Sequence, residues 1–356
     1  MQLLDELRHV VADRGGQVGV TDLAPFPDVE SEIVRRSDDG TRGRLGFTFR
    51  DPVYSTQPRG SFPWGTSIVV VALPYLQEGD GVSPGRTVAR FADGDRYDVM
   101  REVLSVLATR ITTAGYRAET VFDDDRIIDR AVAQRAGVGW SGKSTMILTP
   151  GFGPWVLLGS VVTDAELALS EPMIRTCGTC DACVPACPTG AIVAPGVLDA
   201  RRCLAAVFQT RGDIPIPLRS LAEGRIYGCD DCLTSCPPGH RALESVEAAP
   251  PRLRPSAVLG MNDRDLDAAT RHWYVPGCQV RFVRRNALVA LGNTGNIDDL
   301  GTVAGYAGHP DPMLRRHALW ALHKIAPDIF TSVAARILGS DPDEQVRSDV
   351  AEMMTS

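Results

Sequence analysis

The sequence predicts an α+β protein in three parts: an α/β domain over residues 1–168, a cysteine-rich module over 169–245 and an all-α repeat domain over 246–356. Three observations support this division. The first part combines a β-branched run with amphipathic helical spacings, the second holds eight of the nine cysteines, and a helical motif recurs in the third. Because 44% of the 356 residues are hydrophobic, the chain has enough apolar material for several buried cores.

The N-terminal part carries both helical and strand patterns. Residues 67–73 form a continuous β-branched run that predicts a strand buried on both faces. Over 25–65, abundant Pro, Gly, Arg and Asp predict irregular, site-forming loops. The other elements expected here are helices over 1–16, 100–111 and 127–136 and strands over 146–148 and 155–162.

The C-terminal part contains an internal helical repeat. The segment 285–291 is echoed 31 residues later by 316–322, and a weaker third copy surrounds Val346 and Val350. This pattern is typical of HEAT-like repeats, in which each unit stacks its apolar face on the next. Since two or three copies bury little surface alone, we expect them to dock on the rest of the protein.

Composition limits the possible partners and locations. The net charge of −7 excludes general attraction to nucleic acid, so a polyanionic partner must meet a local patch. No apolar run reaches the roughly 18 residues of a membrane helix, and the N-terminus lacks a signal core, which predicts a cytoplasmic protein. Arginines of the repeat could line a nucleic-acid face, or they could be ordinary solvated helix surface: Arg281, Arg284, Arg285, Arg315 and Arg316.

The cysteine spacing indicates two 4Fe–4S clusters. A C-x2-C-x2-C-x3-C-P run, as in bacterial two-cluster ferredoxins, begins at Cys177, and a second set ends in Cys236-Pro237. The crossed pairing gives one cluster to Cys177, Cys180, Cys183 and Cys236 and the other to Cys187, Cys203, Cys229 and Cys232. Two zinc sites are the alternative, but they require a less specific pattern. The ninth cysteine, Cys278, fits neither set and is expected to be a buried thiol.

Residues 137–144 match the phosphate-loop pattern G-x-x-x-x-G-K-[ST], with Lys143 in the phosphate-binding position. A phosphate loop leaves a strand and enters a helix, so that the helix N-terminus faces the anion. Here the preceding residues are predicted to be helical and the following ones to form a strand. Trp140 within the loop is also too bulky for amides to wrap a phosphate. The sequence therefore argues against nucleotide binding at this loop.

Taken together, the sequence resembles the epoxyqueuosine reductase family over most of its length. The resemblance implies a cobalamin-binding domain related to reductive dehalogenases, a two-cluster ferredoxin module and HEAT-like repeats. It also implies reduction of epoxyqueuosine to queuosine in the tRNA anticodon loop, with an external donor such as flavodoxin or ferredoxin, and a monomeric protein without membrane attachment. The matching stretches include 90–97, 123–143, 159–167, 189–192, 209–212, 225–230 and 285–293.

The resemblance also assigns roles to individual residues. It places the family's proton-donating aspartate at Asp123. A general acid must lie near the leaving oxygen and have a pKa high enough to hold its proton. Without the family, Asp123 with Asp124 and Asp125 predicts an acidic cluster at a helix N-terminus instead. Contacts to cofactor or substrate are implied, with loop packing as the alternative, for Tyr97, Lys143, Gln209, Arg211 and Asp230.

The chain departs from the family pattern in the expected pocket. Arg126 stands where the family commonly has proline, Asp129 where it has glutamate, and 96–98 read Arg-Tyr-Asp instead of Asp-Tyr-His. A family arginine near the cofactor falls close to Ser55. These changes leave two alternatives open: a cobalamin and iron–sulfur reductase of a different substrate, or a ferredoxin-type electron carrier that lacks cobalamin.

Overall fold

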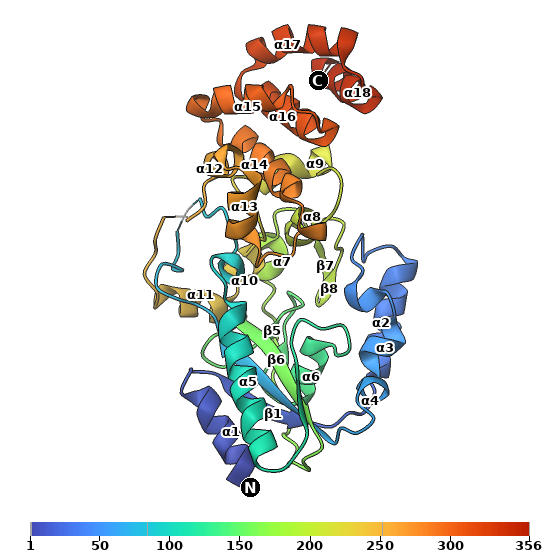
Figure 1. The fold of residues 1–356 in the computed structure, drawn as a ribbon, viewed down its shortest axis with the longest axis vertical. Coiled ribbons are helices and arrows are strands. Elements are labelled where there is room, and N and C mark those ends of the chain that lie inside the picture. The colour runs from blue at the N-terminus through green and yellow to red at the C-terminus, as the bar shows by residue number, and fades with distance from the viewer. Residues whose placement is uncertain (1, 84, 251, 356) are drawn as a thin grey trace. The chain divides into compact units, whose positions relative to one another are not determined.

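The computed structural model describes residues 2–83, 85–250 and 252–355. The chain divides into two compact units (Figure 1). The first unit comprises residues 1–82, 94–203 and 230–248, and the second comprises 83–93, 204–229 and 249–356. Each unit is thus built from segments that are distant in sequence, and the three-part division remains a prediction.

The first unit is built on a four-stranded antiparallel sheet with the strand order β1-β2-β6-β3. Its strands are β1 (Gln17–Thr21), β2 (Ser67–Pro74), β6 (Val156–Thr163) and β3 (Ala118–Val121). The central strand β2 is buried along nearly its whole length, which confirms the strand predicted from its β-branched run. β6 confirms the strand expected over 155–162.

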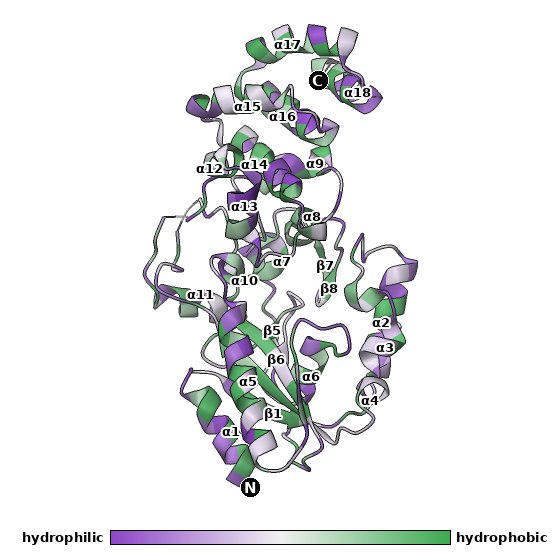
Figure 2. Cartoon of the chain, viewed as in Figure 1, coloured by the Kyte–Doolittle hydropathy of each residue, from purple (hydrophilic) through white to green (hydrophobic). Residues whose placement is uncertain are grey.

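Alternate side chains of β2 serve two different cores, as the two-residue period of a strand requires. Val69 and Val71 pack with residues of α1 (Gln2–Ala12) and α5 (Tyr97–Thr113). Val70 and its alternate neighbours pack with residues of α6 (Asp129–Arg135) instead. Figure 1 shows α1 and α5 on one side of the sheet and α6 on the other. Figure 2 shows hydrophobic residues along the strands of this sheet.

The segment expected to be irregular over 25–65 contains four short helical elements, so that expectation is wrong. The elements are α2 (Pro27–Asp38), η1 (Phe47–Phe49), α3 (Pro52–Thr56) and α4 (Pro58–Ser61). Proline stands in the first turn of the three α-helices. There its missing N–H costs no hydrogen bond and its fixed φ favours the helix. The prolines therefore begin helices here, although their abundance predicts loops.

The cysteine-rich part of the first unit consists of short elements joined by turns. These are α7 (Cys183–Ala186), α10 (Asp231–Thr234), α11 (Pro237–Glu244), the pair β4 (Trp140–Ser141) and β5 (Ile147–Leu148), and the hairpin β7 (Ile192–Ala194) and β8 (Val197–Leu198). Cys236 occupies the N-cap position of α11, which begins at Pro237. Elements of this length bury little surface, which is consistent with a segment ordered by what it binds.

The second unit is helical. It comprises η2 (Arg90–Ala92), α8 (Leu204–Phe208), α9 (Ile216–Arg219), η3 (Ser220–Ala222), α12 (Pro255–Gly260), α13 (Asp263–Thr270), η4 (Pro276–Cys278), α14 (Val280–Thr294), η5 (Ile297–Asp299), α15 (Leu300–Tyr306), α16 (Pro312–Ile325), α17 (Pro327–Ser340) and α18 (Glu344–Thr355). The three predicted repeat copies fall on α14, α16 and α18. These helices share one core with Leu204, Phe208, Ile226 and Tyr227, so the repeats dock on non-repeat residues within this unit, as expected.

Four of the five repeat arginines are largely buried. They therefore form neither the nucleic-acid-binding face nor the solvated helix surface that the sequence left open. Arg285 is 0% exposed and donates to the carbonyl oxygens of Thr210 and Phe208, at 2.8 and 3.2 Å. Arg315 forms two hydrogen bonds with Asp341, at 2.9 and 2.8 Å. The other two buried arginines pair with aspartates: Arg284 with Asp263 and Arg316 with Asp213. These arginines therefore stabilise the repeat domain through buried hydrogen bonds and ion pairs.

Helices long and apolar enough to cross a membrane are absent from the described ranges 2–83, 85–250 and 252–355.

Candidate active site and cluster-binding region

The structure gathers the first predicted set of cluster ligands. Burial raises the pKa of Cys236, and the nearby thiols of Cys177, Cys183 and Cys180 raise it further. Cys183 shows the same pattern, with burial as the main cause and Cys177 and Cys180 adding to it. Cys236 is thus within electrostatic range of the run, although more than fifty residues of chain lie between Cys183 and Cys236. The two thiols with raised pKa values, those of Cys183 and Cys236, need a positive partner to become thiolates.

Lys143 holds the loop that carries this run. Its backbone N–H lies 3.5 Å from the sulfur of Cys177, and its ammonium donates to the carbonyl oxygen of Gly178 at 2.9 Å. Its own carbonyl accepts from the N–H of Gly196 at 2.9 Å. Since α6 precedes this loop and β4 and β5 follow its start, the helix and strands have the order that excludes a phosphate loop. Lys143 therefore faces the cysteines.

The second predicted set is spread over both units. In the first unit, Cys187 accepts from the N–H of Ala191 at 3.2 Å and contacts the Thr189 hydroxyl at 3.6 Å. Although burial opposes them, these hydrogen bonds lower the pKa of Cys187, which favours the ligating thiolate. Cys203 and Cys232 both lie in the same unit, within electrostatic range of Arg130. Cys229 belongs to the second unit.

In the part of the chain that the structure describes, no three His, Cys, Asp or Glu side chains are arranged to hold a single metal ion. A 4Fe–4S cluster has a different requirement, because four cysteines are shared among four irons.

Asp123 lies in the turn that follows β3. Its φ of 53° is in the left-handed region, which is uncommon for a residue other than glycine. Burial raises the pKa of Asp123; Arg101 opposes this rise and Asp124 adds to it. The adjacent Phe122 packs against Tyr97, with ring centroids 5.0 Å apart. A raised pKa is the direction that a general acid needs.

The helix N-terminus alternative for Asp123 is wrong. α6 begins only at Asp129, and its N-cap residue is Ile128. Asp123 therefore lies outside the first turn of the helix, where a carboxylate would stabilise the dipole.

Asp124 and Asp123 have opposite environments although they are adjacent. The backbone N–H and the guanidinium of Arg126 donate to Asp124, the Nη2–Oδ2 distance being 2.6 Å. Arg126 also reaches Glu119 at 2.6 Å and lies over the ring of Phe62, 4.7 Å from its centroid. Although burial acts in the other direction, these hydrogen bonds lower the pKa of Asp124. Arg126, where the family commonly has proline, thus fixes the turn that presents Asp123.

Asp129 and Arg130 stand at the start of α6, where Asp129 is within electrostatic range of Asp123 and Arg130 within range of Cys203 and Cys232. Burial raises the pKa of Asp129 to about 7, with the charge of Asp123 as the next cause. Burial also lowers the pKa of Arg130, although that residue is accessible to solvent. One arginine among 35 offers no signal by which the sequence could have selected it.

Tyr97 and Asp230 belong to the same unit as Asp123. Burial raises the pKa of Tyr97 to about 12, and the charges of Asp123 and Asp129 contribute to the rise. Tyr97 therefore lies within electrostatic range of both carboxyl groups, as its predicted role at the site requires. Asp230 is buried and occupies the N-cap position of α10.

Gln209 and Arg211 belong to the second unit. Arg211 is exposed, and its guanidinium lies near Gly277. The neighbouring Cys278 is also exposed, so the expectation of a buried thiol is wrong. Cys278 ends the short turn Pro276–Cys278 and has a positive φ of 51°.

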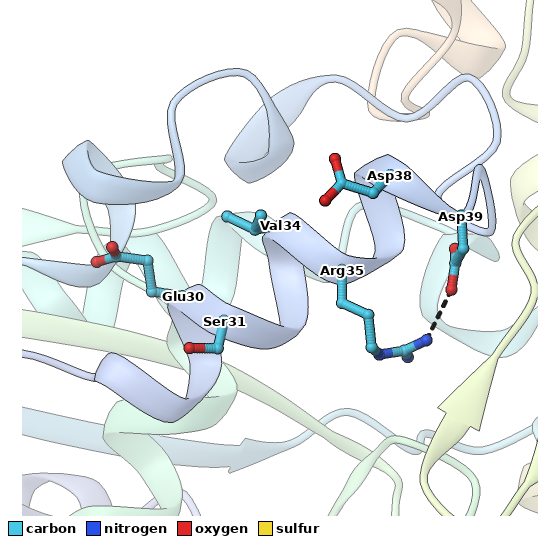
Figure 3. A pocket seen from close by; sticks show the side chains of 6 residues that line it. All are labelled: Glu30, Ser31, Val34, Arg35, Asp38 and Asp39. Carbon is cyan, nitrogen blue, oxygen red and sulfur yellow. Dashed lines mark hydrogen bonds and ion pairs between the residues drawn. The ribbon is translucent and has the colours of Figure 1, made fainter.

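A separate pocket on α2 contains none of the predicted site residues. It has a volume of about 470 Å³ and is lined by Glu30, Ser31, Val34, Arg35, Asp38 and Asp39. Figure 3 shows these residues along one helix, with Arg35 turned to Asp39 at 2.6 Å. Since its cation is already paired, this open surface pocket offers no chemistry for the site around Asp123.

Comparisons with known proteins agree with this arrangement. Residues 176–239 match the family model of a 4Fe-4S double cluster binding domain, and 281–355 match HEAT repeats. An epoxyqueuosine reductase from Bacillus subtilis is 30% identical over 98% of this chain and 94% of its own length. Another, from Xanthomonas campestris, is 34% identical over 89% of this chain and 94% of its own.

Solved structures give the same result. A crystal structure of epoxyqueuosine reductase with an epoxyqueuosine-modified tRNA-Tyr stem loop has a TM-score of 0.89, 29% identity, and coverage of 100% of this chain and 99% of that one. A Bacillus subtilis structure with its catalytic loop swung out of the active site has a TM-score of 0.88, 27% identity, and coverage of 99% and 98%. The fold and the double-cluster module define an iron–sulfur oxidoreductase with a helical-repeat domain. The chain belongs to the epoxyqueuosine reductase family, which confirms the resemblance.

Proposed function

We propose that this protein reduces epoxyqueuosine in the anticodon loop of tRNA to queuosine, with Asp123 as the proton donor. The observation that carries the proposal is the similarity to epoxyqueuosine reductases along nearly the whole chain, at 30% identity over 98% of its residues. A relative of the same fold was solved with the modified tRNA stem loop, which supports tRNA as the substrate.

Two 4Fe–4S clusters would carry electrons to the site. The cysteine ligands match this number of clusters, because the matched module supplies eight cysteines and each 4Fe–4S cluster takes four. One cluster would be held by Cys177, Cys180, Cys183 and Cys236, and the other by Cys187, Cys203, Cys229 and Cys232. The mutual electrostatic influence of the first four thiols supports that grouping. Arg130 would place a positive charge near the second cluster.

Cobalamin is the third proposed cofactor. When bound, it supplies a reduced cobalt centre that can attack an epoxide carbon. The first unit offers polar groups at the start of α6, including the exposed Arg130 and a buried carboxylate oxygen of Asp129 without a described hydrogen-bond partner. These features fit a large polar cofactor. The residues proposed to contact cofactor or substrate are Tyr97, Lys143, Gln209, Arg211 and Asp230.

The residues of this chain would control the proton. Burial raises the pKa of Asp123, the direction that a proton donor needs, and Arg126 holds the neighbouring carboxylate of Asp124 turned to itself. As the carbon–oxygen bond of the epoxide breaks, the Asp123 carboxyl group would donate its proton to the departing oxygen. Developing negative charge on that oxygen is thereby neutralised at the moment it forms.

The other partners follow from this function. Electrons would come from an external one-electron donor of the flavodoxin or ferredoxin class, and the protein would act as a cytoplasmic monomer. These proposals rest on the family and on the redox chemistry of the clusters.

The proposal is tested with protein purified and reconstituted without oxygen. About eight irons and one cobalamin per chain are expected, together with conversion of an epoxyqueuosine-containing stem loop to queuosine. A loaded protein that leaves the stem loop unchanged would favour a reductase of another substrate. About eight irons without cobalamin, under saturating supply, would favour an electron carrier.

A further inference from the structure

Residues 209–215 of the second unit form a linker between α8 and α9 that has no helix or strand of its own. The linker carries Gln209 and Arg211, two of the residues proposed to contact cofactor or substrate. A segment of this kind satisfies few of its own backbone groups, so those that are buried need partners from elsewhere. Side chains of the repeat helices α14 and α16 supply these partners.

The first of these helices, α14, holds the start of the linker. Arg285 donates from Nη1 to the carbonyl oxygen of Thr210 at 2.8 Å, and it also donates to that of Gly212. Asn286 donates from Nδ2 to the carbonyl oxygen of Phe208 at 3.2 Å, and its Oδ1 accepts from Nη2 of Arg285 at 2.8 Å. Since Arg285 is 0% exposed and Asn286 is 1% exposed, water does not compete for these hydrogen bonds.

The second helix, α16, holds the end of the linker. The guanidinium of Arg316 binds the carboxylate of Asp213. Nε2 of His317 accepts from the backbone N–H of Ile214 at 3.2 Å, and Nδ1 donates to the carbonyl oxygen of Met313 at 2.8 Å. Because a backbone N–H can only donate, these two bonds fix one neutral tautomer of the buried His317 ring.

The four side chains occupy equivalent positions in two repeat copies. Residues 285–286 and 316–317 are 31 residues apart, which is the offset of the repeat. In the third copy the equivalent residues are Arg347 and Ser348, and Arg347 donates to the carbonyl oxygen of Asp341 instead. Stacking of the repeat therefore does not require contact with the linker, and this contact is specific to the first two copies.

The linker holds one cation at the surface. Gln209, Thr210 and Gly212 are half-buried, whereas Arg211 is exposed. Arg285 binds the carbonyl groups on both sides of Arg211, which fixes the backbone there. A guanidinium on a fixed backbone loses less conformational entropy on binding an anion than one on a mobile loop.

We propose that the four buried side chains are positioning residues: they hold the linker so that Arg211 binds a phosphate of the tRNA stem loop. The inference rests on the proposed function, because it assigns a phosphate contact to that substrate. Phosphate contacts supply much of the affinity for nucleic acid, and the planar fork of arginine matches a phosphate group. The repeat domain thus acts on tRNA through the linker, although its own arginines are buried.

Asp213 offers the sharpest test, because its side chain is 35% exposed. Asp213→Ala removes the acceptor for Arg316, whereas Asp213→Asn removes the same charge and keeps an acceptor. Loss of a negative charge near Arg211 would by itself strengthen binding to RNA, so weaker binding of the alanine variant reports a lost position. Asp263→Ala is the matched control, since it breaks the ion pair of the neighbouring Arg284 and leaves the linker alone.

The affinity of reconstituted holoenzyme for a labelled epoxyqueuosine-containing stem loop is measured by fluorescence anisotropy. We expect Asp213→Ala to raise Kd about 3- to 10-fold. Asp213→Asn and Asp263→Ala should bind like the wild type. Arg211→Ala should weaken binding and lower the slope of log Kd against log salt concentration by about one. In the Arg211→Ala background, Asp213→Ala should have no further effect, because both act through one contact.

A second pair of variants tests the other end of the linker in the same way. His317→Leu has no acceptor for the N–H of Ile214, whereas the amide oxygen of His317→Gln supplies one. The glutamine variant should therefore regain the affinity that the leucine variant loses. Iron and cobalamin content should match the wild type in every variant that is compared.

Equal affinity of Asp213→Ala and the wild type overturns the inference. So does a loss that is the same for alanine and asparagine, or one that adds to the loss from Arg211→Ala. Cobalamin also carries a phosphate, and loss of cobalamin with stem-loop affinity unchanged would assign Arg211 to the cofactor instead. A loaded wild-type protein that reduces the stem loop while these variants bind normally overturns the inference alone. One that never binds the stem loop overturns the proposed function as well.

Discussion

Arg126 donates two side-chain hydrogen bonds to the carboxylate of Asp124, from Nε to Oδ1 at 3.0 Å and from Nη2 to Oδ2 at 2.6 Å. This bidentate pair fixes one carboxylate of the turn after β3 and leaves its neighbour Asp123 without a salt-bridge partner in the described structure. The pKa values of two adjacent aspartates are thereby shifted in opposite directions, that of Asp123 upwards and that of Asp124 downwards. The arrangement supports the proposal that a chain that departs from its family at position 126 keeps a general acid at 123.

Replacing Asp123 with Asn should remove the general acid and keep the site intact. We expect epoxide reduction to fall by about 100- to 10,000-fold, because the departing oxygen then lacks a positioned proton donor. Queuosine formation in the stem loop is the measurement, with iron and cobalamin content as controls. Full activity in this variant would end the assignment of Asp123.

Replacing Cys232 with Ala should remove one ligand of the second cluster. Total iron should fall from about eight to about four per chain, because a 4Fe–4S cluster needs four cysteine ligands. Cys278→Ala is the matched control, since that cysteine is exposed and belongs to neither predicted set, and it should keep all its iron. Unchanged iron in the Cys232 variant would contradict the proposed ligand grouping.

Replacing Arg285 with Met should destabilise the repeat domain. The fully buried guanidinium donates to several backbone carbonyls, including those of Thr210 and Phe208, which would lose their partner. We expect a loss of about 3–5 kcal/mol, as for breaking a buried charged network. Arg281→Ala should cost less than about 1 kcal/mol, because that side chain is 48% exposed. Denaturant unfolding of both variants measures the difference, and equal losses would contradict the bracing role.

The raised pKa of Asp129 predicts a pH-dependent stability. In the folded protein Asp129 titrates near 7, whereas in the unfolded chain it titrates at its ordinary value of 3.8. Between these values the folded state binds the extra proton, so its stability falls as the pH rises from about 4 to about 7. Asp129→Asn cannot ionise and escapes this loss. After discounting for partial solvent access, the variant should gain about 1–2 kcal/mol relative to wild type between pH 5 and pH 8.

Melting temperatures of the two holoenzymes at pH 5 and pH 8 measure this gain. A difference between variant and wild type that does not change with pH would show that Asp129 is ionised throughout this range.

Features set by local sequence could be predicted, and features set by distant contacts could not. The strand at Ser67–Pro74 and the cluster spacing that begins at Cys177 depend on neighbouring residues alone. The burial of Arg285 depends on carbonyl groups about 75 residues earlier in the chain, which no local pattern reveals. Helices α2, α3 and α4 were obscured because the proline at the start of each also signals a loop.

The candidate site likewise contains residues that the sequence could identify and residues that it could not. Asp123 could be found only through the family resemblance, because three consecutive aspartates equally predict a helix N-terminus. What distinguishes them is Arg126, whose side chain selects Asp124 and leaves Asp123 unpaired. Burial raises the pKa of Asp129 to about 7, and Cys278 is exposed at the end of a short turn. Residue type alone does not predict these features.

The most direct test of the account is mass spectrometry of an epoxyqueuosine-containing tRNA stem loop. The stem loop is incubated with the reconstituted wild-type protein and dithionite in the absence of oxygen. We predict that the modified nucleoside loses the mass of one oxygen atom and becomes queuosine. A protein with both clusters and cobalamin in place that leaves this mass unchanged would contradict the proposed function.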